Sequence, residues 1–244
     1  MSIHRFLYPH ALHAGEFSLV DPALVRQIRT VLRLRVGSPL VLVNTDLHQL
    51  YYGHIIAVFS DRITIDIDRI VDASDRPRRF VHLFLSILKK ENFELAIQKA
   101  TEIGMRSCTA VLCEHTVKTG LSTARLEKII AEAVEQSHQT SMPSYRGIVP
   151  LSEALRYALS EHERVVVCDI SVEELLGNAL PLRREGESVA CFIGPEGGWS
   201  QFERDLFVQY VRQYPDRFFL VGLGQSVLRA ETAAIVSTYT LLNM

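Results

Sequence analysis

Two glycine-rich segments are the places where this chain could hold a ligand with its backbone. Residues 194–198, Gly-Pro-Glu-Gly-Gly, directly follow the apolar run 189–193 and precede a helical pattern. Residues 222–224, Gly-Leu-Gly, follow the apolar run 218–221 in the same way. Glycines leave backbone amides uncovered and let a ligand approach closely. Because ligands of parallel sheets bind beyond the carboxyl ends of the strands, we expect both loops to face one crevice.

The familiar nucleotide-binding patterns do not fit these loops. The second segment begins like a dinucleotide fingerprint, but Val227 occupies the position of the third glycine. That fingerprint also needs an acidic residue at the end of a later strand, and only one helical pattern follows Ala230. The phosphate-binding loop of P-loop nucleotidases is absent from the sequence. The first segment could also be an ordinary connection, although such a connection needs one glycine rather than three.

Alternating strands and helices position the two loops. From residue 80 onward, short apolar runs alternate with segments of helical periodicity, which indicates a parallel α/β sheet. The expected strands are 81–88, 108–113, 165–168, 189–193 and 218–221, and the expected helices are 91–103, 124–137, 151–159, 201–210 and 230–242.

The first 70 residues have a different pattern. Apolar or alternating runs at 40–43, 51–59 and 63–67 predict strands. One helix interrupts them, with Asp21 as its N-cap and Pro22 at its first position. We therefore expect a small β-barrel at 1–70, a polar linker at 71–79 and the α/β domain at 80–244.

Composition excludes several classes of protein. The chain has 244 residues, 48% of them hydrophobic, and a net charge of −2, as is ordinary for a globular protein. No apolar run reaches the roughly 20 residues of a membrane span, and no signal peptide is recognisable, so we expect a cytoplasmic protein. The four cysteines lie in apolar runs without zinc-ligand spacing, which predicts buried thiols and no metal site.

Arginines are concentrated locally despite the near-neutral charge. One cluster lies near the N-terminus and the other lies in the expected linker, and both are compatible with phosphate contacts. Each cluster taken alone is more typical of a solvated surface. The two clusters are Arg26, Arg29, Arg33 and Arg35, and Arg76, Arg78 and Arg79.

Five segments together resemble a known family. They are His4-Arg5-Phe6, Val31-Leu32-Arg33-Leu34, the helix at 93–104, the loop 194–198 and the run 228–233, Leu-Arg-Ala-Glu-Thr-Ala. They are similar to the enzymes that methylate N3 of a uridine in bacterial 16S ribosomal RNA. That family belongs to the SPOUT-like, trefoil-knotted methyltransferases. The resemblance implies a PUA-like barrel that binds RNA, a knotted parallel-sheet domain, a homodimer and S-adenosylmethionine as cofactor.

The resemblance also implies roles for individual residues. The cofactor would be bound by Ile193, Gly194, Pro195, Glu196, Gly197, Gly198, Leu223, Gly224, Ser226, Val227, Leu228 and Arg229. RNA would be bound by Arg5, Arg26, Arg29, Arg33 and Arg35. Arg229 and Glu231 are the catalytic candidates, although Glu231 could instead pair with Arg229 or favour the positive N-terminus of the last helix.

Three positions depart from the family pattern. Members commonly carry arginine where this chain has His115, Gln139 and Ser226. Two functions therefore remain open. The first is methyl transfer to ribosomal RNA of the small subunit. The second is an RNA-binding or ribosome-assembly protein of the same fold whose methyl-transfer target is altered or lost.

Overall fold

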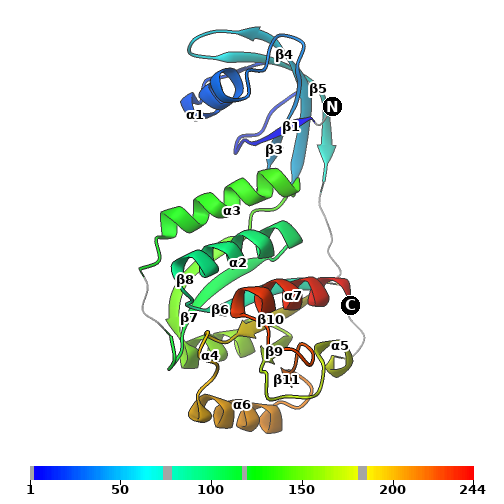
Figure 1. Ribbon diagram of the computed structural model, residues 1–244. Coiled ribbons are helices and arrows are strands. Elements are labelled where there is room, and N and C mark those ends of the chain that lie inside the picture. Colours follow the sequence, from blue (N-terminus) through cyan, green and yellow to red (C-terminus); the bar gives the residue numbers. More distant parts are fainter. Residues whose placement is uncertain (1–2, 74–78, 117–119, 181–185) are drawn as a thin grey trace. The chain divides into compact units, whose positions relative to one another are not determined.

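The computed structural model describes residues 3–73, 79–116, 120–180 and 186–244 (Figure 1). The chain divides into two compact units. The first comprises Met1–Asp75 and Val134–Met142, and the second comprises Arg76–Ala133 and Pro143–Met244. The segment Val134–Met142 therefore packs with the N-terminal unit, although its sequence position lies within the expected α/β domain.

The first unit is built on a five-stranded mixed sheet. Its strand order is β1-β3-β4-β5-β2. β1 pairs with β3 in parallel, and the other pairs are antiparallel. The strands are β1 (His4–Leu7), β2 (Gly15–Leu19), β3 (Pro39–Asn44), β4 (Gln49–Val58) and β5 (Ile63–Asp72). β5 thus extends two residues into the segment expected to be a linker.

Alternating side chains explain how this sheet forms. In β5, Ile63, Ile65 and Ile67 are buried while the residues between them face outward, as a strand with one buried face requires. The expected helix is present as α1 (Pro22–Arg26), and Asp21 accepts hydrogen bonds from the amides of Ala23 and Leu24. A π-helical turn, Gln27–Val31, continues it.

The second unit is a three-layer α/β structure with a six-stranded sheet. The strand order is β11-β9-β10-β6-β7-β8, and every pair is parallel. The strands are β6 (Arg79–Ser86), β7 (Ser107–Leu112), β8 (Ser144–Pro150), β9 (Arg164–Cys168), β10 (Glu187–Ile193) and β11 (Phe218–Val221). The helices are α2 (Lys90–Ile103), α4 (Leu151–Glu161), α5 (Leu176–Ala179), α6 (Gln201–Gln213) and α7 (Ala230–Asn243). α3 (Thr123–Ser137) begins in this unit, and its last residues, from Val134 on, belong to the first unit. The parallel α/β sheet expected from the sequence is confirmed.

Helices cover both faces of the central strands (Figure 1). α7 packs against α2, β6 and β10. On the other face, apolar residues of α4 and α6 join a cluster around Phe84 and Phe192, whose rings stack 4.5 Å apart. Because both faces are covered, the strands are almost wholly apolar, as parallel sheets require.

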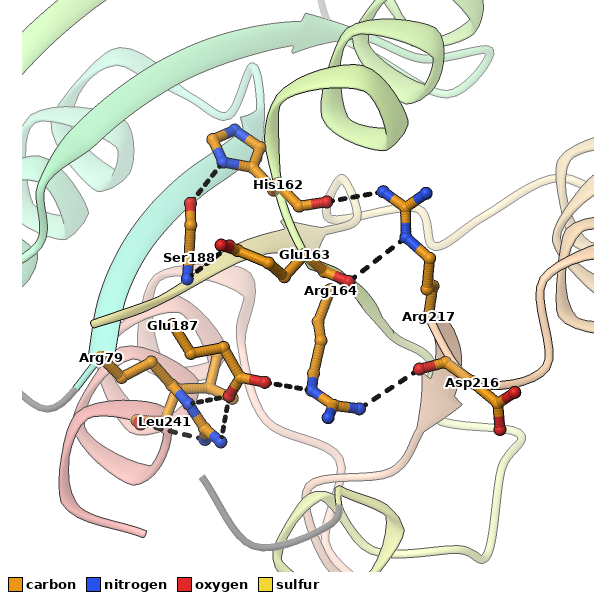
Figure 2. A network of polar contacts seen from close by, with 9 residues as sticks. All are labelled: Arg79, His162, Glu163, Arg164, Glu187, Ser188, Asp216, Arg217 and Leu241. Carbon is orange, nitrogen blue, oxygen red and sulfur yellow. Dashed lines mark hydrogen bonds and ion pairs between the residues drawn. The ribbon is translucent and has the colours of Figure 1, made fainter. Parts of the chain in front are cut away.

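A buried ion pair fixes the amino ends of the strands (Figure 2). Arg79 is fully buried, and its Nη2 lies 2.7 Å from Oε2 of Glu187. Arg79 also donates to the carbonyl oxygen of Leu241 near the end of α7, and Arg164 contacts the second oxygen of Glu187. The suggestion that Arg79 contacts phosphates is therefore wrong, because its charge is used inside the fold. Arg76 and Arg78 lie outside the described residues.

Two further expectations are that the cysteines are buried and that no segment spans a membrane. Cys108, Cys168 and Cys191 are buried free thiols, whereas Cys113 is only half-buried and lies 3.0 Å from the hydroxyl of Ser86. Within the described ranges, no helix is long and apolar enough to cross a membrane.

Candidate functional site

A cavity of about 560 Å³ lies in the second unit, beyond the carboxyl ends of β9 and β10. It is lined by both glycine-rich loops, as the sequence analysis expected of one shared crevice. Eleven of the twelve residues named as cofactor contacts line it: Ile193, Gly194, Pro195, Glu196, Gly198, Leu223, Gly224, Ser226, Val227, Leu228 and Arg229. The catalytic candidate Glu231 lines it as well.

The first loop is held in shape by Trp199. Its buried indole donates a 2.8 Å hydrogen bond to the carbonyl oxygen of Cys168 at the end of β9. A Cβ on Gly194 would lie only 2.9 Å from Cε2 of that ring, so only glycine fits there without a shift. The loop closes as a turn, since the amide of Gly198 donates to the carbonyl oxygen of Pro195 at 2.8 Å. Gly198 adopts a φ of 71°, which favours glycine.

Gly197 is the one named cofactor contact that does not line the cavity. A Cβ on it would lie 3.2 Å from Cβ of His115. Nδ1 of His115 is 3.0 Å from the carbonyl oxygen of Gly198. His115 stands at a position where arginine was expected, and here it packs against the outside of the loop.

The second loop passes very close to another part of the chain. The amide of Gly222 donates to the carbonyl oxygen of Glu174 at 2.7 Å, and its own carbonyl oxygen accepts from Leu176 at 3.0 Å. A Cβ on Gly222 would lie 2.2 Å from the carbonyl oxygen of Val172. Gly222 is therefore required by a close backbone approach, whereas Gly224 is required by its φ of 128°.

Several polar residues of the cavity were missed by the sequence analysis. Asp169 follows β9 and its side chain is 1% exposed, and Nε of Arg204 lies 2.9 Å from its Oδ2. The amide and hydroxyl of Ser171 both donate to its other oxygen. Asn92 donates to Oε1 of Glu196 at 2.7 Å. The position of Asp169 at the end of a predicted strand was the available signal.

The two catalytic candidates have contrasting surroundings. Arg229 is exposed at the N-cap of α7, and its side chain has no partner among the residues that the structure describes. Glu231 is buried in the first turn of α7. Its Oε2 has no hydrogen-bond partner within the described part of the chain. A pair between Glu231 and Arg229 is therefore not observed. Glu231 does lie in the first turn of α7, where a negative charge interacts favourably with the helix dipole.

The arginines named as RNA contacts belong to the first unit. Arg26 and Arg29 are exposed on the helical segment, and Arg33 and Arg35 are exposed in the loop that follows it. Arg29 donates to the carbonyl oxygen of Ser60 at 3.1 Å. Arg5 is half-buried in β1 and donates to the carbonyl oxygen of His138 at 2.9 Å.

One cluster in the described residues has ligand atoms close enough to hold a metal ion. His54, Asp66 and Asp68 lie on β4 and β5 with these atoms within 4.8 Å of one another. Nδ1 of His54 is 3.2 Å from Oδ2 of Asp68, so an exposed hydrogen-bonded pair accounts for two of the three groups.

Comparisons with known proteins identify a family and several similar proteins. A family model described as RNA methyltransferase domain matches residues 75–242. Ribosomal RNA small subunit methyltransferase E of Rickettsia conorii is 27% identical over 234 residues, which cover 91% of this chain and 88% of that protein. The protein of the same name from Mesomycoplasma hyopneumoniae is 30% identical over 168 residues, which cover 68% and 70%.

Two solved structures are similar over almost the whole chain. One is the small subunit methyltransferase E of Neisseria gonorrhoeae bound to S-adenosylmethionine, with 25% identity, a TM-score of 0.82 and coverage of 97% of this chain and 95% of that one. The other is a putative methyltransferase of Legionella pneumophila with the same bound cofactor, also at 25% identity and a TM-score of 0.82, with coverage of 99% and 97%.

Proposed function

This chain belongs to the RNA methyltransferase domain family, and on that premise we propose that it methylates N3 of one uridine in 16S ribosomal RNA, with S-adenosylmethionine as donor. The observation that carries the proposal is the cavity formed by two glycine-rich loops beyond the carboxyl ends of the parallel strands. The names of the relatives and the cofactor in the two similar structures support it.

The residues around the cavity fit this cofactor. A volume of about 560 Å³ lies within the range of roughly 300–1,000 Å³ typical of small-molecule sites. The loops offer backbone amides and carbonyls that suit an adenine ring and a ribose. Asp169 and Arg204 place one negative and one positive charge in the wall, which suits the oppositely charged groups of the methionine end.

The chemistry left to the protein concerns the uridine. S-adenosylmethionine supplies a methyl group already activated on a positively charged sulfur. N3 of uridine carries a proton and is a poor nucleophile until that proton leaves. The chain must therefore align N3 with the methyl group and favour the deprotonated base.

Arg229 is the residue we assign to the deprotonated base. Its side chain is exposed at the cavity and engaged by no other described residue, so its fixed charge is available to the carbonyl oxygens of a uridine anion. Glu231 is the candidate acceptor of the N3 proton, because its buried carboxylate lines the same cavity and Oε2 lacks a partner in the described chain.

The finer features of the family belong to the same proposal. We propose that the first unit is a PUA-like barrel, that the segment leading into α7 forms the trefoil knot, and that the enzyme acts as a cytoplasmic homodimer. The exposed Arg26, Arg29, Arg33 and Arg35, with Arg5, would contact RNA phosphates. RNA affinity should then fall steeply with salt, because bound cations are released from the RNA.

Methyl transfer to defined RNA tests the proposal. The full chain is incubated with methyl-labelled cofactor and with 16S RNA or small subunits that lack the modification. Label at N3 of a single uridine, located by nuclease mapping and mass spectrometry, is the expected result. RNA binding without any methyl transfer would reject the enzyme and favour the assembly protein. The reason to consider that outcome is that His115, Gln139 and Ser226 stand where family members commonly carry arginine.

A further inference from the structure

Two cations line the cofactor cavity and a third is next to one of them in the sequence, all three without partners among the described residues. Lys89 and Arg229 line it, and Lys90 is exposed beside Lys89 at the start of α2. Within the described ranges, no carboxylate, carbonyl or aromatic ring engages any of their side chains. Most of the other described cations of the second unit have protein partners. The ion pairs are Arg79–Glu187, Lys99–Glu102, Arg125–Glu94, Lys128–Glu132, Arg164–Glu187 and Arg204–Asp169.

The two lysines are not where helix stability would place them. Lys89 is the N-cap of α2 and makes no side-chain capping bond, and Lys90 is the first helical residue. Positive charge at a helix N-terminus opposes the helix dipole. By contrast, α6 begins with a complete capping box formed by Ser200 and Glu203. A local arrangement that disfavours folding is expected at sites under functional constraint.

We propose that Lys89 and Lys90 bind the RNA phosphates that flank the target nucleotide and so hold its base over the cofactor. The inference rests on the proposed function and assigns an RNA contact to the catalytic unit, separate from the arginines of the first unit. A target base that enters the cavity must bring its neighbouring phosphates to the rim. Lys89 lies there, and the exposed Lys90 follows it in the chain, also without a partner in the described residues. The nearby carboxylates are those of Glu91 and Glu196, which are both exposed. Asn92 donates a hydrogen bond to Glu196.

The test compares two double variants of the full-length enzyme that remove the same charge. K89A/K90A removes the proposed contacts. R156A/R212A removes two exposed cations of α4 and α6 that have no described side-chain partner and do not line the cavity. We expect K89A/K90A to raise the KM for 16S RNA by about tenfold. The slope of log kcat/KM against log salt should become shallower by about 1.4, or roughly 0.7 per phosphate on single-stranded RNA.

Three further measurements separate this role from others. K89R/K90R keeps both charges and should restore the KM. Because Lys89 lines the cavity, K89A/K90A is expected to lower the affinity for S-adenosylmethionine, measured by calorimetry, by less than about fivefold, well below the effect on the KM for RNA; a loss as large as that in the KM would place the lysines on the cofactor and overturn the proposal. The Tm should stay the same or rise, because cations leave a helix N-terminus; a lower Tm would indicate a structural role and overturn it as well.

The remaining outcomes distinguish the two levels of inference. Equal KM changes in K89A/K90A and R156A/R212A would mean that only overall charge matters, which rejects the lysine contacts while methyl transfer stands. Absence of methyl transfer by the unmodified protein would reject the proposed function itself, and this inference with it.

Discussion

A methyl group added at Gly194 should reveal how tightly the first loop is braced. In Gly194→Ala, the new Cβ would lie 2.9 Å from Cε2, 3.1 Å from Nε1 and 3.2 Å from Cδ2 of Trp199. The ring cannot simply turn away, because it packs edge-on against Phe207 with centroids 5.0 Å apart. Moving it would also strain its hydrogen bond to the carbonyl oxygen of Cys168.

The size of the effect follows from these contacts. Overpacking of a well-packed core costs about 1–3 kcal/mol, and a weakened buried hydrogen bond adds about 0.5–1.5 kcal/mol. We expect Gly194→Ala to lower the free energy of unfolding by about 2–4 kcal/mol. Because Gly194 and Cys168 both line the cavity, cofactor affinity should fall as well.

A double-mutant cycle with Trp199→Phe checks the reasoning. Phenylalanine has a single six-membered ring in place of the fused indole and lacks Nε1, so it removes atoms that the new Cβ would strike. Gly194→Ala should therefore cost less than about 1 kcal/mol in the Trp199→Phe background, a coupling within the usual range for residues in contact. The assay is urea unfolding followed by far-ultraviolet circular dichroism, since Trp199 is the single tryptophan. An equal cost of Gly194→Ala in both backgrounds would refute the steric explanation.

Three further predictions concern other parts of the second unit. Glu187→Gln should lower the free energy of unfolding by about 3–5 kcal/mol, because it leaves the fully buried Arg79 without its counter-charge; a loss below about 1 kcal/mol in urea would contradict this. Arg229→Lys should retain cofactor affinity but lose most single-turnover methylation, because an ammonium cannot reproduce the planar guanidinium; normal rates with unchanged pH dependence would remove this residue from the mechanism. Burial lowers the pKa of His82 to about 3 and that of His162 to about 4. Since the unfolded histidines take up protons below about pH 6.5, stability should be complete above that pH and fall as the pH drops towards 4 and 3. His82→Phe should make the urea midpoint less dependent on pH across this window, and an identical dependence would count against the burial argument.

The sequence by itself determined the features that depend on nearby residues. Strand–helix alternation gave the parallel sheet, and Asp21 with Pro22 gave the start of α1. The glycines at 194–198 and 222–224 marked both loops of the cavity. These succeed because capping, turn conformation and the direction of a parallel strand are set within a few residues.

Three strands at the edges of the sheets could not be predicted from nearby residues. β1, β2 and β8 were not predicted. The residues of β8 alternate between exposed and half-buried, so no strong apolar pattern marks it. What makes each of them a strand is its pairing with a partner far along the chain, as when His4 of β1 aligns with Leu40 of β3.

Tertiary structure alone decided which polar groups and glycines serve the site. Arg79 looks like part of a basic linker, but it is buried because Glu187, 108 residues away, supplies its counter-charge. Gly197 does not line the cavity and approaches His115 instead, whereas Gly222 is required by its close approach to the backbone of Val172. Asp169 lines the cavity, and Arg204 of α6 donates to its carboxylate there. In each case the deciding partner is distant in sequence, and the cost of burying a charge or overlapping two atoms depends only on what the folded chain brings next to it.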